Sequence, residues 1–179
     1  MRTYVKRDIP QRGVRVGSVT FRRLYTMLGH DQGGVMNACA LARSLAVWVP
    51  AVTRYVDLLM DLMLVRRIPA FHASAGEPLI KPPGTLIGDS GILHTLLGLR
   101  VLDDLIPHPV AGPSWQGFVM EKLISAAPPQ TDAFRYRTRA GAGIDLLLRL
   151  PDRRHWAIGV KRKSAPKLSK GFRIAAAEP

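Results

Sequence analysis

The sequence predicts a mixed α/β (α+β) fold, in which a winged helix-turn-helix unit precedes a second α/β domain built around a mostly antiparallel or mixed sheet. Two segments with apolar residues at helical spacing, 38–46 and 49–63, flank a tight turn, and the strand-like LMLVRRI follows them. Residues 69–87 are rich in proline and glycine, which indicates a boundary. Residues 143–161 read as two apolar strands around a polar turn. We therefore expect three units, at residues 1–75, 76–165 and 166–179.

The first unit is expected to be mostly helical. Apolar residues recur at helical spacing over 19–28, and Asn37 is a suitable N-cap for the helix at 38–46. Pro50 falls in the first turn of the helix at 49–63, where proline is tolerated. With the strand that follows, this is the pattern of a winged helix-turn-helix.

The N-terminal end of the second helix of this motif is poorly suited to reading DNA. In DNA-binding versions its first residues enter the major groove, and here they are Trp48, Val49, Pro50 and Ala51. Apolar side chains make few hydrogen bonds to base edges, although Arg54 could reach a phosphate. Two interpretations stay open, which are DNA contact through this helix and a packing or inter-domain module.

The second unit is expected to alternate short strands and helices. Thr85–Ile87 is a candidate strand, and Asp89 or Ser90 is expected to cap a helix that ends at Leu97. Ser114 is expected to cap the next helix. In that helix apolar residues recur at the spacing of a buried face, at Trp115, Phe118, Val119 and Leu123.

A further strand and a tail follow. Phe134–Thr138 is expected as a strand from which Arg135 and Arg137 point outward. The segment from Ser164 onward starts basic and ends in small residues, which fits either a partial helix or a disordered tail.

The hairpin at 143–161 carries the candidate chemistry. A turn centred on Arg153 places Asp145 opposite Lys161. Since side chains alternate along a strand, one face should be buried, and it consists of Ile144, Leu146, Leu148, Leu150, Trp156, Ile158 and Val160. The other face consists of Gly143, Asp145, Leu147, Arg149, Ala157, Gly159 and Lys161. The one acid and the one lysine of these strands thus meet on the same face.

This hairpin resembles the core of the PD-(D/E)XK, restriction-endonuclease-like, superfamily. Its members place Asp on one strand and Glu-x-Lys on the next, often with a Glu on a preceding helix. The carboxylates hold Mg²⁺, the metal activates water, and the Lys stabilises developing charge. Asp145 and Lys161 match, but Gly159 stands at the second carboxylate and Gln116 at the helix carboxylate. The resemblance implies the fold and a remnant site of Asp145, Lys161 and Gln116, in which Asp145 alone could still bind a metal.

Two further interpretations of these residues remain. Glu121 is a possible substitute acid, but it lies roughly 140° round the helix from Gln116 and would point elsewhere. Asp145 and Lys161 could also be a cross-strand ion pair with no catalytic role, worth roughly 0.2–1 kcal/mol.

Most of the chain is also similar to the C-terminal half of a family of bacterial and archaeal AAA-type ATPases, in which a helix-turn-helix segment precedes an uncharacterised nuclease-like domain. The matching stretches are residues 4–11, 41–69, 88–99, 112–123, 137–148 and 156–162. That family commonly shows Glu where this chain has Gln116, Gly143 and Gly159, so three acids are absent together. The resemblance implies that the ATPase half lies outside this chain, which itself has no G-x-x-x-x-G-K-[ST] loop.

The composition favours a polyanionic partner. Lys and Arg number 26 against 13 acids, which gives a net charge of +13. The charge is concentrated at the ends, where residues 1–23 carry seven basic residues and one acid, and residues 149–173 carry nine and one. The alternative is a solvated basic surface with a loose tail.

The remaining composition limits the cellular compartment and the kinds of site that the chain can have. The single cysteine, Cys39, excludes an internal disulfide and suits a reducing, cytoplasmic compartment. The histidines and the cysteine lack zinc-site spacing, and no run of about 18 apolar residues could span a membrane. The N-terminus has no apolar core of the kind that a signal peptide needs.

The leading functional expectation is a non-catalytic accessory region of an AAA-type ATPase, whose degenerate nuclease-like core binds nucleic acid electrostatically and without a cofactor. One alternative is a divergent Mg²⁺-dependent DNA nuclease that uses Asp145, Lys161 and a further acid. Another is a protein-interaction or oligomerisation module, for an ATPase or for copies of this chain, which the apolar Trp48 and Val49 favour. The expected nucleic-acid contacts are Arg54, Arg135, Arg137, Arg139, Lys161, Arg162, Lys163, Lys167 and Lys170.

Overall fold

The computed structural model describes residues 17–71, 83–137 and 143–177, which form a mixed α/β fold with seven helices and two small antiparallel sheets. The helices are α2 (Ser18–His30), α3 (Ala38–Leu45), α4 (Val49–Asp61), α5 (Ser90–Leu96), α6 (Leu102–Leu105), α7 (Ala111–Ala126) and α8 (Lys170–Ala176). The strands are β1 (Val65–Ile68), β2 (Gly84–Ile87), β3 (Asp132–Arg137), β4 (Gly143–Arg149) and β5 (His155–Ile158). The expected boundary between residues 75 and 76 lies outside the described residues.

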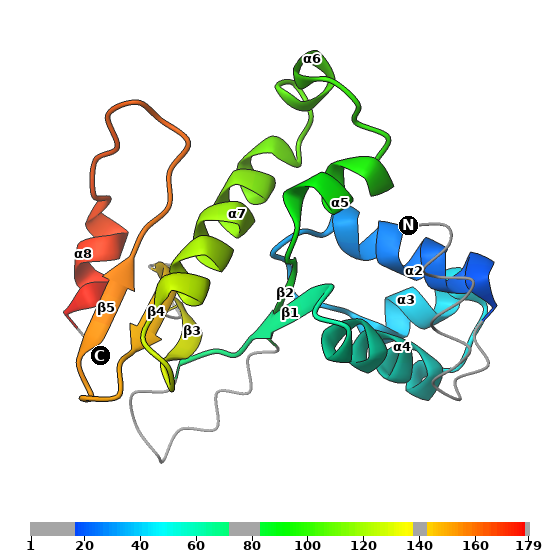
Figure 1. The fold of residues 1–179 in the computed structure, drawn as a ribbon, viewed down its shortest axis with the longest axis horizontal. Coiled ribbons are helices and arrows are strands. Elements are labelled where there is room, and N and C mark those ends of the chain that lie inside the picture. Colours follow the sequence, from blue (N-terminus) through cyan, green and yellow to red (C-terminus); the bar gives the residue numbers. More distant parts are fainter. Residues whose placement is uncertain (1–16, 72–82, 138–142, 178–179) are drawn as a thin grey trace.

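The helices α2, α3 and α4 pack around one apolar core and confirm the three helices expected there (Figure 1). Asn37 caps α3 as predicted, since its side-chain oxygen accepts a hydrogen bond of 3.0 Å from the Ala40 N–H. Ala46 ends α3 in the left-handed conformation, with φ of 52°, which turns the chain directly into α4. The centre of the core is fully buried and includes Phe21, Leu24, Tyr25, Val52, Val56, Leu59 and Leu93.

The strands β1 and β2 form a two-stranded antiparallel ribbon, in which Val65 pairs with Ile87 and Ile68 with Gly84. The strand expected at 85–87 is therefore confirmed, and its partner is the strand that follows α4. A two-stranded ribbon is marginal by itself, and this one is held by side chains on both sides. Leu86 and Ile68 pack toward the second sheet, whereas Val65 and Ile87 pack toward the helices α2–α5.

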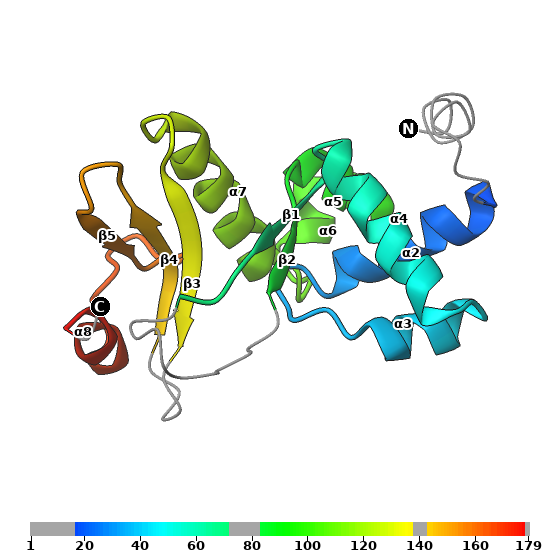
Figure 2. The same cartoon turned by 90° about the horizontal axis from the view of Figure 1, so that it is seen from below.

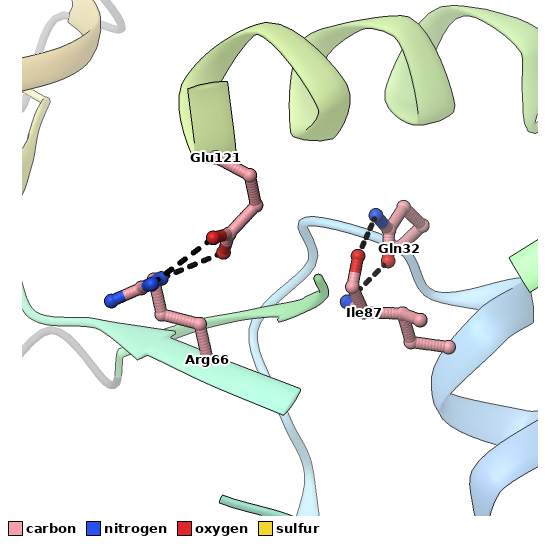
Figure 3. Close-up of polar contacts among 4 residues, drawn as sticks. All are labelled: Gln32, Arg66, Ile87 and Glu121. Atoms are coloured by element: carbon pink, nitrogen blue, oxygen red, sulfur yellow. Dashed lines mark hydrogen bonds and ion pairs between the residues drawn. The ribbon is translucent and has the colours of Figure 1, made fainter. Parts of the chain in front are cut away.

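The outer edge of β2 is completed by the chain that follows α2 (Figure 3). The Gly33 N–H donates to the Thr85 carbonyl at 2.8 Å, and the Thr85 N–H donates to the Gly34 carbonyl at 2.9 Å. Gln32 continues this pattern with its side chain, because its Oε1 accepts from the Ile87 N–H at 2.8 Å and its Nε2 donates to the Ile87 carbonyl at 3.2 Å. Gln32 is buried, and α7 approaches it so closely that a Cβ on Gly117 would lie 2.7 Å from its Nε2.

The helix α7 differs from the prediction at its start and in its buried face. It begins at Ala111, so Ser114 is not its cap but lies in its second turn, where its hydroxyl is 2.8 Å from Nε2 of His94 on α5. The buried residues are Ala111, Ser114, Gly117 and Met120, and the predicted apolar face is wrong because Trp115 and Phe118 are exposed. The helix α5 agrees with the prediction, and Asp89 caps it by accepting from the Ile92 N–H.

The strands β3, β4 and β5 form an antiparallel sheet in sequence order, covered on both faces. Met120 of α7 packs against Leu146 and Leu148 on one face, and Ala175 of α8 packs against Leu147 on the other. The prediction of a single buried face is therefore incomplete, and it is wrong for Trp156, which is 50% exposed. Figures 1 and 2 place this sheet and the helices α2–α4 at opposite ends of the molecule, with α7 and the ribbon between them.

The Gln32 contacts generate a stability prediction. Gln32→Leu removes both hydrogen bonds to Ile87 at similar volume and leaves two buried main-chain groups unpaired, so we expect unfolding to become easier by about 2–4 kcal/mol. Denaturant unfolding measures this change. Gln116→Leu on α7 is the matched control, with an expected change below about 1 kcal/mol. Equal effects at the two positions would contradict a special role for Gln32.

The His94–Ser114 contact generates a pH prediction. Burial lowers the pKa of His94, and the Asp89 charge only partly opposes this. Below about pH 6.5, the ordinary histidine pKa, the unfolded chain therefore binds a proton at His94 more readily than the folded chain does. The free energy of unfolding thus keeps its full value above about pH 6.5 and falls as the pH drops further. We expect His94→Gln to reduce the loss of stability between about pH 7 and 5 in denaturant titrations, and His30→Gln, on the exposed end of α2, to leave it unchanged.

Candidate functional site

The register of the β4–β5 hairpin differs by two residues from the predicted one. Arg149 pairs with His155 and Leu146 with Ile158, where the pairing ends, so this register directs Gly159, and not Lys161, toward Asp145. The turn is centred on Asp152, whose carboxylate accepts from the Arg154 N–H at 3.0 Å. Because a shift of two residues keeps each side chain on its face, Asp145 and Lys161 still lie on the same side of the hairpin.

A β-bulge further alters the alternation along β4. Between the pairs Phe134–Leu147 and Tyr136–Ile144, strand β3 has one residue and β4 has two, Asp145 and Leu146. Ile144 therefore packs with Leu147 in the core beneath α8, and its predicted place on the face of Leu146 is wrong. The bulge includes Asp145, which is the candidate metal ligand.

One oxygen of the Asp145 carboxylate, Oδ2, is satisfied within the protein. Its Oδ2 accepts from the Val160 N–H at 2.9 Å and lies 3.7 Å from Nζ of Lys161, and the side chain is only 18% exposed. Arg135, the residue opposite the bulge, adds a second positive charge, and its interaction with Asp145 favours the protonated guanidinium. One oxygen of the carboxylate thus serves as an internal hydrogen-bond acceptor and ion-pair partner.

Gly159, at the position of the second carboxylate of the nuclease pattern, faces α8. A Cβ built on Gly159 would lie 3.1 Å from Cδ2 and 3.2 Å from Cε2 of Phe172. An acidic side chain here would have to displace that ring. Phe172 is held in place because Ser169 caps α8, and the Ser169 hydroxyl accepts from the Phe172 N–H at 3.1 Å.

The two candidate residues of α7 are placed apart from Gly159. The helix covers the face of the sheet that carries Leu146 and Leu148, whereas Gly159 faces α8 on the other side. Gln116 is half-buried in the first half of α7. Glu121 points elsewhere, as expected, and binds Arg66 of β1 through two hydrogen bonds of 2.7 and 3.0 Å (Figure 3). It therefore joins α7 to the ribbon and is engaged there.

These residues do not fit a Mg²⁺ site. Magnesium in proteins is held by oxygen ligands, commonly carboxylates, and here Asp145 would be the one acidic ligand. Its neighbours are cationic, so a divalent ion would have to displace Lys161 and be repelled by Arg135. Over residues 17–71, 83–137 and 143–177 no group of three His, Cys, Asp or Glu side chains is arranged to hold a metal.

Of the expected nucleic-acid contacts, Arg135 is placed differently from the prediction. Its guanidinium turns inward, donates a hydrogen bond to the Gly33 carbonyl, and crosses Gly84 where a side chain would collide with it. Burial lowers its pKa, and the charge of Arg137 acts in the same direction. The expectation that Arg135 points outward is therefore wrong. Arg137 and Arg54 are exposed, and Arg139 lies outside the described residues.

The remaining expected contacts lie together on the segment that joins β5 to α8. Each of them is exposed, namely Lys161, Arg162, Lys163, Lys167 and Lys170. From residue 153 to 177 the chain has eight Lys and Arg residues and no acid. In Figure 1 this segment projects from the sheet as a loop before it returns into α8. We call this run of exposed cations, residues 161–170, the β5–α8 basic segment.

Two residues that shape the site were missed in the sequence. Phe172 was not singled out, although Ser169 three residues earlier is an ordinary N-cap signal for a helix that would present it. Arg66 was included only in a strand, and no local pattern links it to Glu121, which lies 55 residues further along the chain.

Residues 1–103 match the sequence model of the family described as domain of unknown function DUF8612, which covers more than half of the chain. The chain belongs to this family. Beyond the DUF8612 segment, residues 111–179 match a second family, described as domain of unknown function DUF4143. The DUF8612 segment ends after α5, at the start of α6. The DUF4143 segment begins at the first residue of α7.

The relatives are longer proteins. The chain is 37% identical over 173 residues to the uncharacterized protein Rv2008c of Mycobacterium tuberculosis and to the uncharacterized protein Mb2031c of Mycobacterium bovis. The match covers 97% of this chain but spans only 39% of the length of these relatives. No solved structure matches the chain. Among the described helices, none combines the length and the apolar character needed to cross a bilayer.

The packing of Gly159 generates a prediction. Gly159→Glu restores the acid of the nuclease pattern but forces the Phe172 ring to move, so we expect a loss of about 1–3 kcal/mol in unfolding free energy and no Mg²⁺-dependent cleavage of DNA. In the Phe172→Ala background the same substitution should cost less, because the ring is gone. A double-mutant cycle on denaturant unfolding measures this coupling, and additive costs would contradict the contact.

Proposed function

We propose that this chain is a non-catalytic accessory region of an AAA-type ATPase, in which a nuclease-like core has lost its metal site and binds nucleic acid through its basic surface. The observation that carries the proposal is the internal satisfaction of Asp145. A catalytic carboxylate must be available to a metal or to water, whereas this one accepts the Val160 N–H and lies beside Lys161.

The basic surface supplies the binding half of the proposal. The β5–α8 basic segment carries five exposed cations of the expected set, and no acid between residues 153 and 177 offsets them. Nucleic acid releases condensed counterions when such side chains neutralise its phosphates, and this release drives sequence-independent binding. We therefore expect the contacts to include Arg162, Lys163, Lys167 and Lys170, with Lys161 shared between phosphate and Asp145.

The proposal also concerns the architecture. The order α3, tight turn, α4, β1 and β2 is in keeping with a winged helix-turn-helix, and a sheet with α7 and α8 on its two faces is in keeping with a degenerate PD-(D/E)XK domain. The relatives extend well beyond the matched segment, which leaves room for an ATPase domain in the longer proteins. This agrees with the resemblance of the sequence to the C-terminal half of AAA-type ATPases.

A salt titration tests the proposal. Labelled duplex and single-stranded DNA are titrated with Mg²⁺ present at about 50 and 200 mM salt, and the DNA is recovered on a gel. If five phosphates are neutralised, affinity should fall about 500-fold between these concentrations, since each contributes a slope of roughly −0.9 on logarithmic axes. Intact DNA with salt-dependent binding is the expected result. Binding that is absent at low salt, or nearly independent of salt, would contradict the proposal.

Matched charge reversals locate the surface. Lys163→Glu with Lys167→Glu should weaken binding by roughly tenfold or more, because two phosphate contacts are replaced by repulsion. Arg22→Glu with Arg23→Glu changes the net charge equally on exposed positions of α2 and should have the smaller effect. Equal effects would mean that net charge alone matters.

The nuclease alternative has its own readout in the same gels. Cleavage that requires Mg²⁺ and disappears in Asp145→Ala would overturn the non-catalytic assignment. Cleavage that survives Asp145→Ala would point to a contaminating activity or to a site elsewhere in the chain.

A further inference from the structure

The turn between α3 and α4 carries an exposed apolar surface at the end of the molecule farthest from β5 (Figures 1 and 2). Trp48 is 84% exposed, and Val49 beside it is also exposed. Both line an open hollow of about 660 Å³. We call this the α3–α4 hollow, and its lining consists of Cys39, Ala42, Arg43, Ala46, Val47, Trp48, Val49 and Pro50.

The local structure explains why the surface is apolar and fixed. The turn is closed by the Val47 N–H, which donates to the Ala42 carbonyl at 3.0 Å, after Ala46 in the left-handed conformation. Trp48 then occupies the N-cap of α4 in an extended conformation without a capping side chain. Ser, Thr, Asp or Asn would stabilise this position better, by about 1 kcal/mol. The tryptophan therefore occupies its place at some cost to the helix.

The start of α4 is not built to hold a phosphate. Helix N-termini bind anions through free N–H groups of the first turn. Here Pro50 has no N–H, and the N–H groups of Ala51 and Val52 already donate to the Trp48 carbonyl at 2.9 and 3.3 Å. This leaves the Val49 N–H alone among the first four residues, so a nucleic-acid backbone gains little from this end of the helix.

The charge around the hollow defines the other feature of its partner. Arg43 is the one charged residue in the lining, and it is exposed. A segment that fills the hollow with apolar side chains therefore meets the positive charge of Arg43 beside it, and an acidic flanking residue complements that charge.

We propose that the α3–α4 hollow is a docking site for a partner polypeptide segment that inserts an apolar side chain beside Trp48 and carries acidic residues at its flanks. Exposed tryptophan and arginine are the residue types that most often dominate binding at protein interfaces. The hollow is separate from the β5–α8 basic segment. Peptide binding in the hollow and nucleic-acid binding at that segment do not depend on each other.

A selection experiment tests the proposal without a known partner. A displayed library of random 16-residue peptides is selected on the whole chain and, in parallel, on Trp48→Glu. The expected result is a group of peptides retained only by the parent, with an apolar or aromatic anchor flanked by Asp or Glu. Trp156→Glu, which replaces a tryptophan that is 50% exposed on β5, is the matched control and should retain the same peptides. No peptide that depends on Trp48, or a group with basic flanks, would overturn the proposal.

A charge swap and a thiol probe sharpen the test. A selected peptide should bind Arg43→Glu roughly tenfold more weakly than the parent, and replacing its flanking acids with lysine should reverse that order. The single cysteine, Cys39, lines the hollow and is exposed, so the bound peptide should slow its reaction with a thiol reagent. Protection that is equal in Trp48→Glu would contradict binding in the hollow.

Two further outcomes are decisive. Both variants must show the parent's unfolding midpoint within error, which the exposure of Trp48 and Arg43 leads us to expect. If Trp48→Glu instead abolishes DNA binding and no peptide depends on Trp48, the hollow belongs to a nucleic-acid surface and the proposal fails. Loss of DNA binding in the Lys163 and Lys167 variant alone would leave the peptide result unaffected.

Discussion

The hydrogen bonds of the β1–β2 ribbon are the constraint on which the rest of the fold depends. Two strands do not form a stable sheet in water, and their buried main-chain groups must find partners on every side. Gln32, Gly33 and Gly34 supply those partners along the outer edge of β2. Gln32 does so with its side-chain amide, which bonds to both main-chain groups of Ile87 as a neighbouring strand would. Arg66 on β1 then binds Glu121, so that α7 is fixed against the same ribbon. The helical core and the second sheet meet through these contacts.

At the candidate site, the residues that match the nuclease pattern make structural contacts. Asp145 and Lys161 remain within reach of each other, but the carboxylate accepts a main-chain N–H and the neighbouring position is a glycine. The side-chain direction of that glycine leads onto Phe172, so α8 occupies the space in which another acid would stand. The same helix buries the second face of the sheet through Ala175. The space beside Gly159 is thus filled by α8 and belongs to the packed core of the sheet.

The sequence was informative where the signal was local. Asn37 and Asp89 are caps whose side chains reach main-chain N–H groups three residues on, and both helices begin where those residues predict. The ion pair between Asp145 and Lys161 also agrees with the alternation of side chains along the two strands of one hairpin. The register was wrong because Asp152, not Arg153, centres the turn, and neither the bulge in β4 nor the inward path of Arg135 has a local signal.

The surface of α7 and the second face of the sheet depended on contacts between distant segments. Ser114 is a residue type typical of helix caps, but it is buried and its hydroxyl contacts Nε2 of His94 on α5. With this side of α7 buried, Trp115 and Phe118 are exposed. Leu147 looked solvent-facing until α8 covered it, and a helix that lies 23 or more residues further along the chain cannot be placed from hairpin periodicity. Apolar periodicity thus identified the helix without identifying its buried side.

The order of the second sheet has a consequence for how copies of the protein behave beside one another. The outer side of β3 is occupied, because the Arg135 N–H donates to the Pro69 carbonyl and the Phe71 N–H donates to the Arg135 carbonyl. In the described part of the chain, β5 pairs only with β4, so its other side offers free N–H and C=O groups to any passing strand. Charged side chains stand at both ends of that open edge, where Arg154 pairs with Asp152 before β5 and Lys161 lies beside Asp145 after it. A strand of four residues flanked by charged side chains is a poor template for a second copy, which opposes edge-to-edge association despite the exposed Trp156.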